Sequence, residues 1–491
     1  MPRSAARLRK SSSLTGRSSS TAKSFCASSS RIDLLVIRRI LIANRGEIAV
    51  RIIRTCRALH IETVLAVSDA DRDSEPARLA DRTVCIGPAP ASGSYLNAAA
   101  IVQAALGTQV DAVHPGYGFL SERPALAQLC EAHGLVFIGP TAAQLEAVSD
   151  KLRARGEAQR AAIPVAVGAT VTTLDQATAA AREIGTPLLV KAVGGGGGRG
   201  MKRVDRLEEL PAAMELAAAE AQAGFGDPRV FLERFIPRAR HVEVQVFGDG
   251  TGNVVHMGER DCSVQRRYQK LLEESPAPGL SEDCRRSLHE AAVRFGERLS
   301  YRGAGTVEFL VDQQSDGFFF LEMNARIQVE HPVTEAVTGL DLIAEQIAVA
   351  SGAGLSFAQS DIRFQGHAME CRVNAEDPAN DFAPSPGLTR TAIWPSGEGI
   401  RVDTHIASGS RVPPFYDSLL GKVIVHGSDR NTALERLRSA IAAVRIVGVQ
   451  TNLSFHARLL ADPEFHAGGV DTGFVERLLE RRQKFAEVRS G

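Results

Sequence analysis

A glycine-rich segment, GGGGGRGM at residues 194–201, is the clearest sign of chemistry in the sequence. Glycine tolerates positive φ and lets backbone N–H groups crowd around an anion, as a phosphate-binding loop requires. The segment lies between two predicted strands and lacks a Gly-Lys-Ser/Thr ending, so its context fits neither a dinucleotide-binding loop nor a Walker A loop. We therefore interpret it as a flap that closes over a triphosphate, with Lys191 at its mouth, rather than as a linker.

A pair of glutamates forms a second candidate site. Two alternating segments flank the turn signal QQSDG, which predicts a β-hairpin. If the hairpin closes symmetrically about Ser315, Glu308 and Glu322 face each other, and Asn324 shares their face. Like charges at such a position destabilise a hairpin unless a cation lies between them. The two interpretations are a Mg²⁺ or Mn²⁺ site, because hard cations prefer carboxylate oxygens, and a pair of solvated glutamates.

The segment RIQVE follows this hairpin and combines three kinds of polar side chain. In an extended chain Arg326, Gln328 and Glu330 project to the same side. A guanidinium, an amide and a carboxylate on one face could bind a small oxyanion and remove its proton.

Two further segments carry polar side chains that we expect near the same site. In HVEVQV, residues 241–246, polar and valine residues alternate, so one face of the strand is polar and the other belongs to the core. The run ERDCSVQRRYQK, residues 259–270, is rich in cations, which is usually a mark of solvated surface. Beside phosphate-binding and anion-binding elements, we predict that it faces the active site. Its four cations are Arg260, Arg266, Arg267 and Lys270.

The elements that must position these residues divide into three predicted regions. Over residues 37–150 short apolar strands alternate with helices, which predicts a doubly wound parallel sheet. Residues 151–240 form a linker helix and a small lid with the glycine-rich segment. From residue 241 to 491 long alternating strands indicate a mostly antiparallel sheet covered by helices. The fold class is therefore α/β and α+β. The first four strands are expected at Arg39–Ala43, Ile61–Val67, Val110–Val113 and Val136–Ile138.

Residues 1–36 differ in composition from all that follows. They are rich in Ser, Arg and Lys, and no acidic residue precedes Asp33. Such a segment is typical of an organelle transit peptide, and equally of a disordered tail or of upstream sequence included by a wrongly chosen start codon. The remainder is Ala- and Arg-rich in a bacterial manner, which favours the latter two interpretations and a cytoplasmic protein.

Composition indicates a soluble protein of several domains. The net charge of the 491-residue chain is zero, so charge gives no indication of binding to nucleic acid or to a membrane surface. No apolar run approaches the roughly 20 residues that span a bilayer. The seven cysteines are scattered, without a C-x-x-C pair. They predict neither a zinc site nor a disulfide framework, and fit a reducing compartment.

Five motifs, in order, resemble those of the biotin carboxylases of the ATP-grasp superfamily: KAVGGGGGRGM, RHVEVQV, ERDCSVQRR-x-QK, EMNARIQVEHPVTE and ECRVNAEDP. The resemblance begins at RRILIANRGEIAVRI and runs to the C-terminus. It implies a three-part ATP-grasp ligase that carboxylates biotin with MgATP and bicarbonate. It further implies that Glu330 deprotonates bicarbonate, which attacks the γ-phosphorus of ATP. The carboxyphosphate formed breaks down to CO₂ and phosphate, phosphate removes the ureido proton of biotin, and Arg372 stabilises the enolate that captures CO₂.

The resemblance also assigns roles to individual residues. The catalytic residues implied are Glu330, Arg372, Lys270 and Arg326. Contacts to ATP or bicarbonate are implied for Lys151, Lys191, Gly196, Gly197, Gly198, Gly200, Met201, Glu233, Phe235, Ile236, His241, Gln265, Gln328 and Val329. The ligands implied for two Mg²⁺ or Mn²⁺ ions are Glu308, Glu322 and Asn324.

Partners are implied as well. The sequence contains no A-M-K-M biotinylation motif, so we expect a free-standing subunit that works with a biotin carboxyl carrier protein and a carboxyltransferase. Together they would form a carboxylase for acetyl-CoA or another acyl-CoA, as in fatty acid biosynthesis. A homodimer is the expected oligomer, with no nucleic acid or membrane partner.

Two positions depart from the family pattern, and two other functions remain open. Tyr268 stands where the family usually has His, and Ser149 where Gly is usual. Because Tyr cannot become cationic, nucleotide affinity or its pH dependence is in doubt. The alternatives are an ATP-grasp ligase that joins another carboxylate to an amine, and a non-catalytic nucleotide-binding subunit. Arg372 and the segment from Arg326 to Glu330 argue against the first, and the intact Glu330 and Lys270 against the second.

Overall fold

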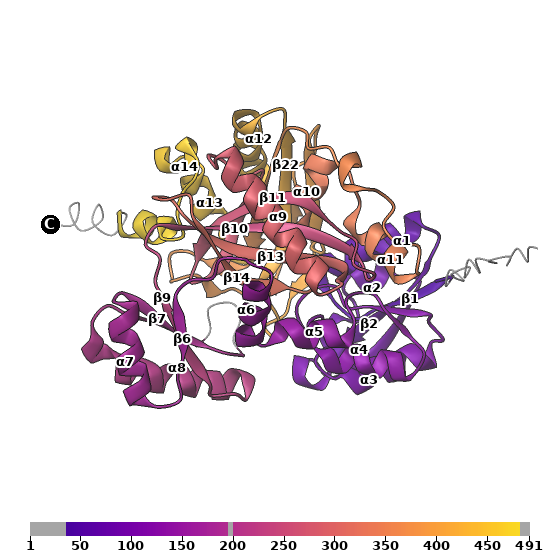
Figure 1. Ribbon diagram of the computed structural model, residues 1–491. Coiled ribbons are helices and arrows are strands. Elements are labelled where there is room, and N and C mark those ends of the chain that lie inside the picture. The colour runs from indigo at the N-terminus through magenta and orange to yellow at the C-terminus, as the bar shows by residue number, and fades with distance from the viewer. Residues whose placement is uncertain (1–35, 195–199, 482–491) are drawn as a thin grey trace, which may run out of the picture. The chain divides into compact units, whose positions relative to one another are not determined.

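In the computed structural model, which describes residues 36–194 and 200–481, the first strands and helices alternate along the chain (Figure 1). They build a five-stranded sheet of order β3-β2-β1-β4-β5, and all of its strand pairs are parallel. This confirms the doubly wound sheet predicted from the sequence. The strands are β1 (Arg39–Ile42), β2 (Glu62–Ser68), β3 (Arg82–Gly87), β4 (Ala112–His114) and β5 (Val136–Phe137). The helices are α1 (Gly46–Ala58), α2 (Glu75–Leu79), α3 (Ala98–Gly107), α4 (Pro124–Ala132) and α5 (Ala142–Ser149).

A four-stranded antiparallel sheet of order β6-β9-β7-β8 follows. Apolar side chains from one face of its strands share a core with two helices, and Lys191 and Glu233 point to the other face. The glycine-rich segment joins β7 to β8, since Lys191 pairs with Met201 across that hairpin; its residues 195–199 lie outside the described residues. The elements are α6 (Lys151–Arg160), β6 (Gly168–Thr170), α7 (Leu174–Ile184), β7 (Leu188–Ala192), β8 (Met201–Val204), α8 (Leu210–Phe225) and β9 (Val230–Arg234).

The largest element is an eight-stranded sheet of order β14-β13-β10-β11-β12-β15-β22-β20, antiparallel throughout. The mostly antiparallel C-terminal part that the sequence predicts is thus confirmed. Its strands are β10 (Ala239–Asp249), β11 (Val254–Arg266), β12 (Gln269–Ser275), β13 (Arg302–Asp312), β14 (Phe318–Asn324), β15 (His367–Asn374), β20 (Ile400–Thr404) and β22 (Leu419–Gly427). The helices around it are α9 (Glu282–Arg298), α10 (His331–Thr338), α11 (Leu342–Ala350), α12 (Arg430–Ala443), α13 (Leu453–Leu459) and α14 (Pro463–Ala467).

The side chains of strand β15 alternate between the two faces of this sheet. Met369, Cys371 and Val373 belong to the apolar core beneath α12. Ala368 packs instead with Val333 and Val337 of α10. Because side chains alternate along a strand, Glu370 and Arg372 lie on the α10 side together with Ala368. This side of the sheet carries polar side chains deep inside the protein, which an apolar core alone does not explain.

The hairpin β13–β14 has the predicted pairing of its two glutamates. Glu308 lies opposite Glu322, and Thr306 opposite Asn324. An irregularity after Glu308 shifts the register by one, so the hairpin is not symmetrical about Ser315. The prediction of a facing glutamate pair is therefore confirmed, whereas the symmetrical turn is wrong because a β-bulge intervenes.

A buried ion pair joins the first sheet's helix α1 to the large sheet. Lys422 of β22 is fully buried, and its Nζ lies 3.2 Å from Oε1 of Glu47, whose side chain is 1% exposed. The same ammonium donates to the carbonyl oxygen of Val329 at 2.7 Å. A charge this deep needs its partners, because removing one partner leaves the other buried and uncompensated.

No described helix is both long enough and apolar enough to cross a membrane.

Lys422→Met tests this buried link. We expect a loss of about 3–5 kcal/mol in the free energy of unfolding, because Glu47 would remain buried without its cation. The matched control is Lys202→Met. It removes an ion pair at the surface, in which the side chain of Lys202 is 27% exposed and that of Glu220 is 41% exposed. The control should lose about 1 kcal/mol or less. Urea unfolding followed by circular dichroism measures both; equal losses would contradict a special role for Lys422.

Candidate active site

The ammonium group of Lys270 lies at the centre of three carboxylates. It comes from β12 and donates to Glu330 at 2.6 Å, to Glu308 at 3.1 Å and to Glu243. Burial alone would lower the pKa of Lys270, but Cys262 and these three carboxylates raise it well above its usual value. The lysine is therefore permanently charged and holds together residues from β10, β12, β13 and the turn before α10.

Glu330 is bound by two cations at once. Its side chain is 2% exposed, one oxygen accepts from Lys270, and the other accepts from Nη2 of Arg372 at 2.9 Å. Burial would raise the pKa of Glu330, yet Lys270, Arg372 and Arg260 together lower it well below the usual range. In this arrangement Glu330 is an ionised carboxylate, and its basicity depends on whether both cations stay in place.

Arg260 is fully buried, and its guanidinium group binds several polar side chains of this cluster. It donates to Glu243 at 2.6 Å, to Gln245 at 2.8 Å and to the side-chain oxygen of Gln328 at 2.7 Å. A planar fork of donors suits such a network. Of the four cations predicted to face the site, Arg260 and Lys270 do so. Arg266, the last residue of β11, and Arg267, in the turn that follows, instead pair with Asp381.

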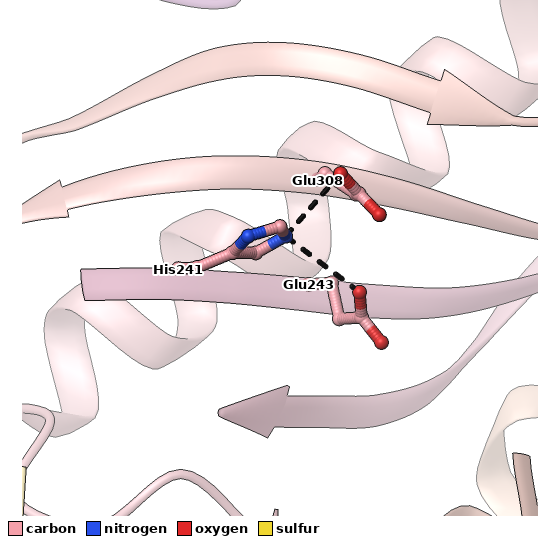
Figure 2. Close-up of side chains that lie close together, drawn as sticks. All are labelled: His241, Glu243 and Glu308. Atoms are coloured by element: carbon pink, nitrogen blue, oxygen red, sulfur yellow. Dashed lines mark ion pairs between the residues drawn. The ribbon is translucent and has the colours of Figure 1, made fainter. Parts of the chain in front are cut away.

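Figure 2 shows His241 of β10 with its ring beside Glu308 of β13 and Glu243 of its own strand. Its Nε2 lies 3.2 Å from Glu308 and 3.8 Å from Glu243. Burial lowers the pKa of His241, but the charge of Glu308, the hydrogen bond with Glu308 and the charge of Glu243 together outweigh burial and raise the pKa. One ligand atom from each of the three residues lies within 4.8 Å of the others, which is close enough to share a cation.

The carboxylates predicted to bind metal fit that role by their chemistry. Glu308 and Glu322 face each other in register, and Lys151 Nζ lies 2.9 Å from Glu322. The side-chain oxygen of Asn324 accepts from Nη2 of Arg326 at 2.7 Å. Carboxylate and amide oxygens are the donors that Mg²⁺ prefers. Cations thus neutralise these oxygens here, and Mg²⁺ would take over part of that task.

Two of the residues implied to contact the nucleotide, Lys191 and Glu233, lie on the face of the small sheet that points away from its apolar core. Lys191 is 3% exposed and lies 2.8 Å from Glu233, which also accepts from Arg155 at 3.0 Å. The Glu233 carboxylate is therefore engaged by two cations in this state. Gly200 adopts φ of +70°, and a Cβ there would lie 2.7 Å from the Cβ of Ala192, so glycine is needed. Gly196, Gly197 and Gly198 lie outside the described residues.

The remaining implied residues are placed as follows. Met201 lies opposite Lys191 in the β7–β8 hairpin, and Gln265 lies opposite Lys270 in the β11–β12 hairpin. The backbone of Val329 is held by Lys422 through its carbonyl. The guanidinium carbon of Arg203 lies over the ring of Phe235, 4.4 Å from the ring centre. Ile236, which follows β9, is half-buried.

Several residues of the cluster were not identified from the sequence. Glu122 accepts from Nε of Arg326 at 2.9 Å, and Glu273 accepts from Nε of Arg372 at 2.6 Å. Lys422 donates to the backbone carbonyl of Val329. A charged residue inside an otherwise apolar strand, such as the lysine in LLGKVIVHG, is costly to bury and was the available signal for Lys422. Glu122 lies in a loop and has no comparable signal.

Comparisons with known proteins agree on one family. The family model for the biotin carboxylase N-terminal domain matches residues 36–145, and the model for the biotin carboxylase C-terminal domain matches residues 370–477. Between them, residues 150–358 match the ATP binding domain of the carbamoyl-phosphate synthase L chain.

Relatives match the chain over nearly their whole length. A biotin carboxylase of Nostoc sp. is 47% identical over 442 residues, which are 90% of this chain and 99% of the relative. The crystal structure of a biotin carboxylase complex with β-γ-ATP from Campylobacter jejuni has a TM-score of 0.88 and 44% identity, covering 90% of this chain and 99% of that one. A biotin carboxylase domain dimer of the 2-oxoglutarate carboxylase of Hydrogenobacter thermophilus, in complex with MgADP, ADP and bicarbonate, has a TM-score of 0.87 and 41% identity, covering 90% and 97%.

Glu308→Gln and Glu322→Gln test the metal site. Each removes a charged ligand, so we expect the affinity for Mn²⁺ in the presence of ATP to fall by about tenfold or more. Electron paramagnetic resonance of free Mn²⁺ measures the binding. Glu345→Gln is the control, because this buried carboxylate of α11 accepts hydrogen bonds from Ser356, away from the hairpin. Unchanged binding in both test variants would exclude the hairpin as the metal site.

Proposed function

The chain belongs to the biotin carboxylase family, and from this premise we propose the reaction that its site performs. ATP and bicarbonate are used to carboxylate biotin, with ADP and phosphate as the other products. The observation that carries the proposal is the position of Glu330 between Lys270 and Arg372, beside the facing pair of Glu308 and Glu322. A base, an anion-binding cation and a metal-binding hairpin are thereby within one cluster, as the joining of bicarbonate to a phosphoryl group requires.

The ion pairs of the cluster suggest how Glu330 becomes a base. Bicarbonate is an anion and competes with Glu330 for Lys270, and with Glu122 for nearby Arg326. When Lys270 turns toward the bound anion, Glu330 loses a cationic partner and its pKa rises, because less positive charge stabilises its ionised form. The carboxylate is thus strengthened as a base only when its substrate is bound. It can then remove the proton as bicarbonate attacks the γ-phosphorus.

The remaining residues stabilise charge and exclude water. Lys151 and Lys191 bind phosphate oxygens of ATP, and Mg²⁺ held by Glu308, Glu322 and Asn324 would neutralise the charge that develops on the phosphoryl group. The glycine-rich segment lies in the loop of the β7–β8 hairpin, where it can cover the phosphates and keep carboxyphosphate from water. Arg372 stabilises the biotin enolate, which captures CO₂.

We further propose the partners. Biotin is presented by a separate carrier protein, and a separate carboxyltransferase passes the carboxyl group on to acetyl-CoA or another acyl-CoA, in a bacterial cytoplasm. A homodimer is the proposed oligomer, supported by the biotin carboxylase domain of Hydrogenobacter thermophilus, which is described as a dimer.

Glu330→Gln tests the reaction and its base. In the wild type we expect bicarbonate-dependent ATP hydrolysis that free biotin stimulates. The variant should lose about 10²–10⁴-fold in rate, since an amide cannot accept the proton. ADP release in a coupled assay measures both proteins, and Glu345→Gln should keep the wild-type rate. Measurable ATP binding without any dependence on bicarbonate or biotin in the wild type would overturn the proposed function.

Tyr268→His tests the departure from the family pattern. Tyr268 is 51% exposed and forms, with Arg267, the two-residue turn between β11 and β12, where both residues have positive φ. An imidazole there becomes cationic below about pH 6.5 and can assist binding of phosphate. We expect the KM for ATP to fall about threefold to tenfold at pH 6 and to change little at pH 8. Tyr268→Phe is the control and should show no such pH dependence. An equal effect at both pH values would argue against charge assistance.

A further inference from the structure

Two buried glutamates face each other directly behind Arg372. Glu273 of β12 lies opposite Glu370 of β15, and both side chains are fully buried. Two like charges at directly opposed positions repel strongly in a medium of low dielectric, and water cannot screen them here. Both carboxyl groups therefore cannot be ionised together without a large cost.

The partners of the two groups are unequal. Oε1 of Glu273 accepts from Nε of Arg372 at 2.6 Å and also contacts Nη2 of that guanidinium. Among the described residues, no hydrogen-bond partner reaches the other oxygen of Glu273 or either oxygen of Glu370. An ionised carboxylate without a single donor is costly to bury, whereas a neutral carboxyl group is much less so.

Charged groups from several neighbouring elements act on Glu370. Burial raises its pKa well above the usual value; Lys422 of β22 and Arg372 favour its ionised form, and Glu273 and Glu330 oppose it. On the α10 side, His331 has a pKa lowered by burial and is neutral. Glu335 is bonded to Arg51 and Arg401.

Glu273 differs from Glu370 in its balance of charges. Burial raises its pKa to about 7 while Arg372 opposes that rise. Of the two carboxyl groups, Glu273 is therefore the one more easily ionised, and its negative charge lies against the guanidinium.

We propose that Glu273 and Glu370 form a pair that holds one proton, kept on Glu370, and that this pair positions Arg372. Ionised Glu273 anchors the guanidinium through Nε, and neutral Glu370 prevents a second negative charge behind it. Arg372 contacts Glu273 and Glu330 through Nε and Nη2, and its side chain is 17% exposed, so its Nη1 side remains accessible to a ligand. The role of Arg372 toward biotin rests on the proposed function, whereas the shared proton does not.

Infrared spectroscopy of the whole chain at neutral pH tests the proton without any activity. The wild-type minus Glu370→Gln difference spectrum should contain a carbonyl band of a protonated carboxyl group that shifts in D₂O. Glu274→Gln is the matched control. Glu274 is the next residue of β12, equally buried on the opposite face, and it accepts from His367 and Arg430. Its difference spectrum should lack this band. Absence of the band for Glu370→Gln would overturn the proposal.

Kinetics test the positioning. Glu370→Gln keeps a neutral, similarly shaped side chain, so kcat/KM for biotin should stay within about threefold of the wild type. Glu273→Gln removes the anchor of Arg372 and should lower kcat/KM for biotin by about tenfold to a hundredfold, since a charged hydrogen bond is lost. Bicarbonate-dependent ATP hydrolysis without biotin should stay within about threefold of the wild type in Glu370→Gln. In Glu273→Gln it should fall less than the turnover of biotin, because Lys270 still holds Glu330 when Arg372 has lost its anchor. Glu274→Gln should leave both rates unchanged, although it lowers stability.

Two results would overturn the positioning role. One is an equal loss of biotin turnover in Glu370→Gln and Glu273→Gln, which would mean that Glu370 acts as a carboxylate. The other is full biotin turnover in a folded Glu273→Gln. If Glu273→Gln does not fold, the infrared band and the kinetics of Glu370→Gln still decide whether Glu370 is neutral. A wild type without biotin-dependent turnover would count against the proposed function, and the infrared result would stand apart from it.

Discussion

The ammonium group of Lys270 is the constraint on which the site depends. Glu243, Glu308 and Glu330 come from separate segments of the large sheet and its connections, and their mutual repulsion would open the cluster without a common cation. Lys270 satisfies all three, and buried Arg260 adds a second positive charge beneath them. Polar groups at this depth are stable only when nearly all of their donors and acceptors are paired. The strand register that places these side chains is therefore tied to the charges they carry.

The same pairing makes substrate binding an exchange of partners. The three lysines expected to bind ATP or bicarbonate are each already paired with a carboxylate of the protein: Lys151 with Glu322, Lys191 with Glu233, and Lys270 with Glu330. A ligand that binds here replaces an internal ion pair, so part of the electrostatic gain is offset by the pair that is lost. The protein in turn avoids uncompensated charges while the site waits for its ligands.

Much of the architecture could be predicted from the sequence, because strand alternation and helix spacing follow from side-chain periodicity. The facing of Glu308 and Glu322 was deduced from the turn signal alone, although a bulge at Leu321 of β14 makes the hairpin asymmetric. Strand β3 was not predicted, because most of its residues are exposed or half-buried and it lacks a clear apolar pattern.

The site was harder to predict where contacts join distant segments. The pairing of Glu273 with Glu370 depends on which strands are neighbours, and the order of β12 beside β15 cannot be derived from local patterns. Closeness in sequence to Lys270 did not place Arg266 and Arg267 among its partners, because both arginines pair with Asp381 instead. The motif resemblance predicts the principal residues, and only the fold revealed the side chains that bind to them.

The contact between Lys422 and Glu47 has a consequence for how this protein can be divided. This charge pair is buried between helix α1 of the first sheet and the large sheet. The same lysine donates to the backbone carbonyl of Val329, the residue before Glu330, which we propose as the base. The N-terminal region is thus no interchangeable module. In a chimaera that takes its N-terminal region from a relative, that region must carry a carboxylate at the position of Glu47. Without it, the ammonium group of Lys422 would be buried without a compensating charge.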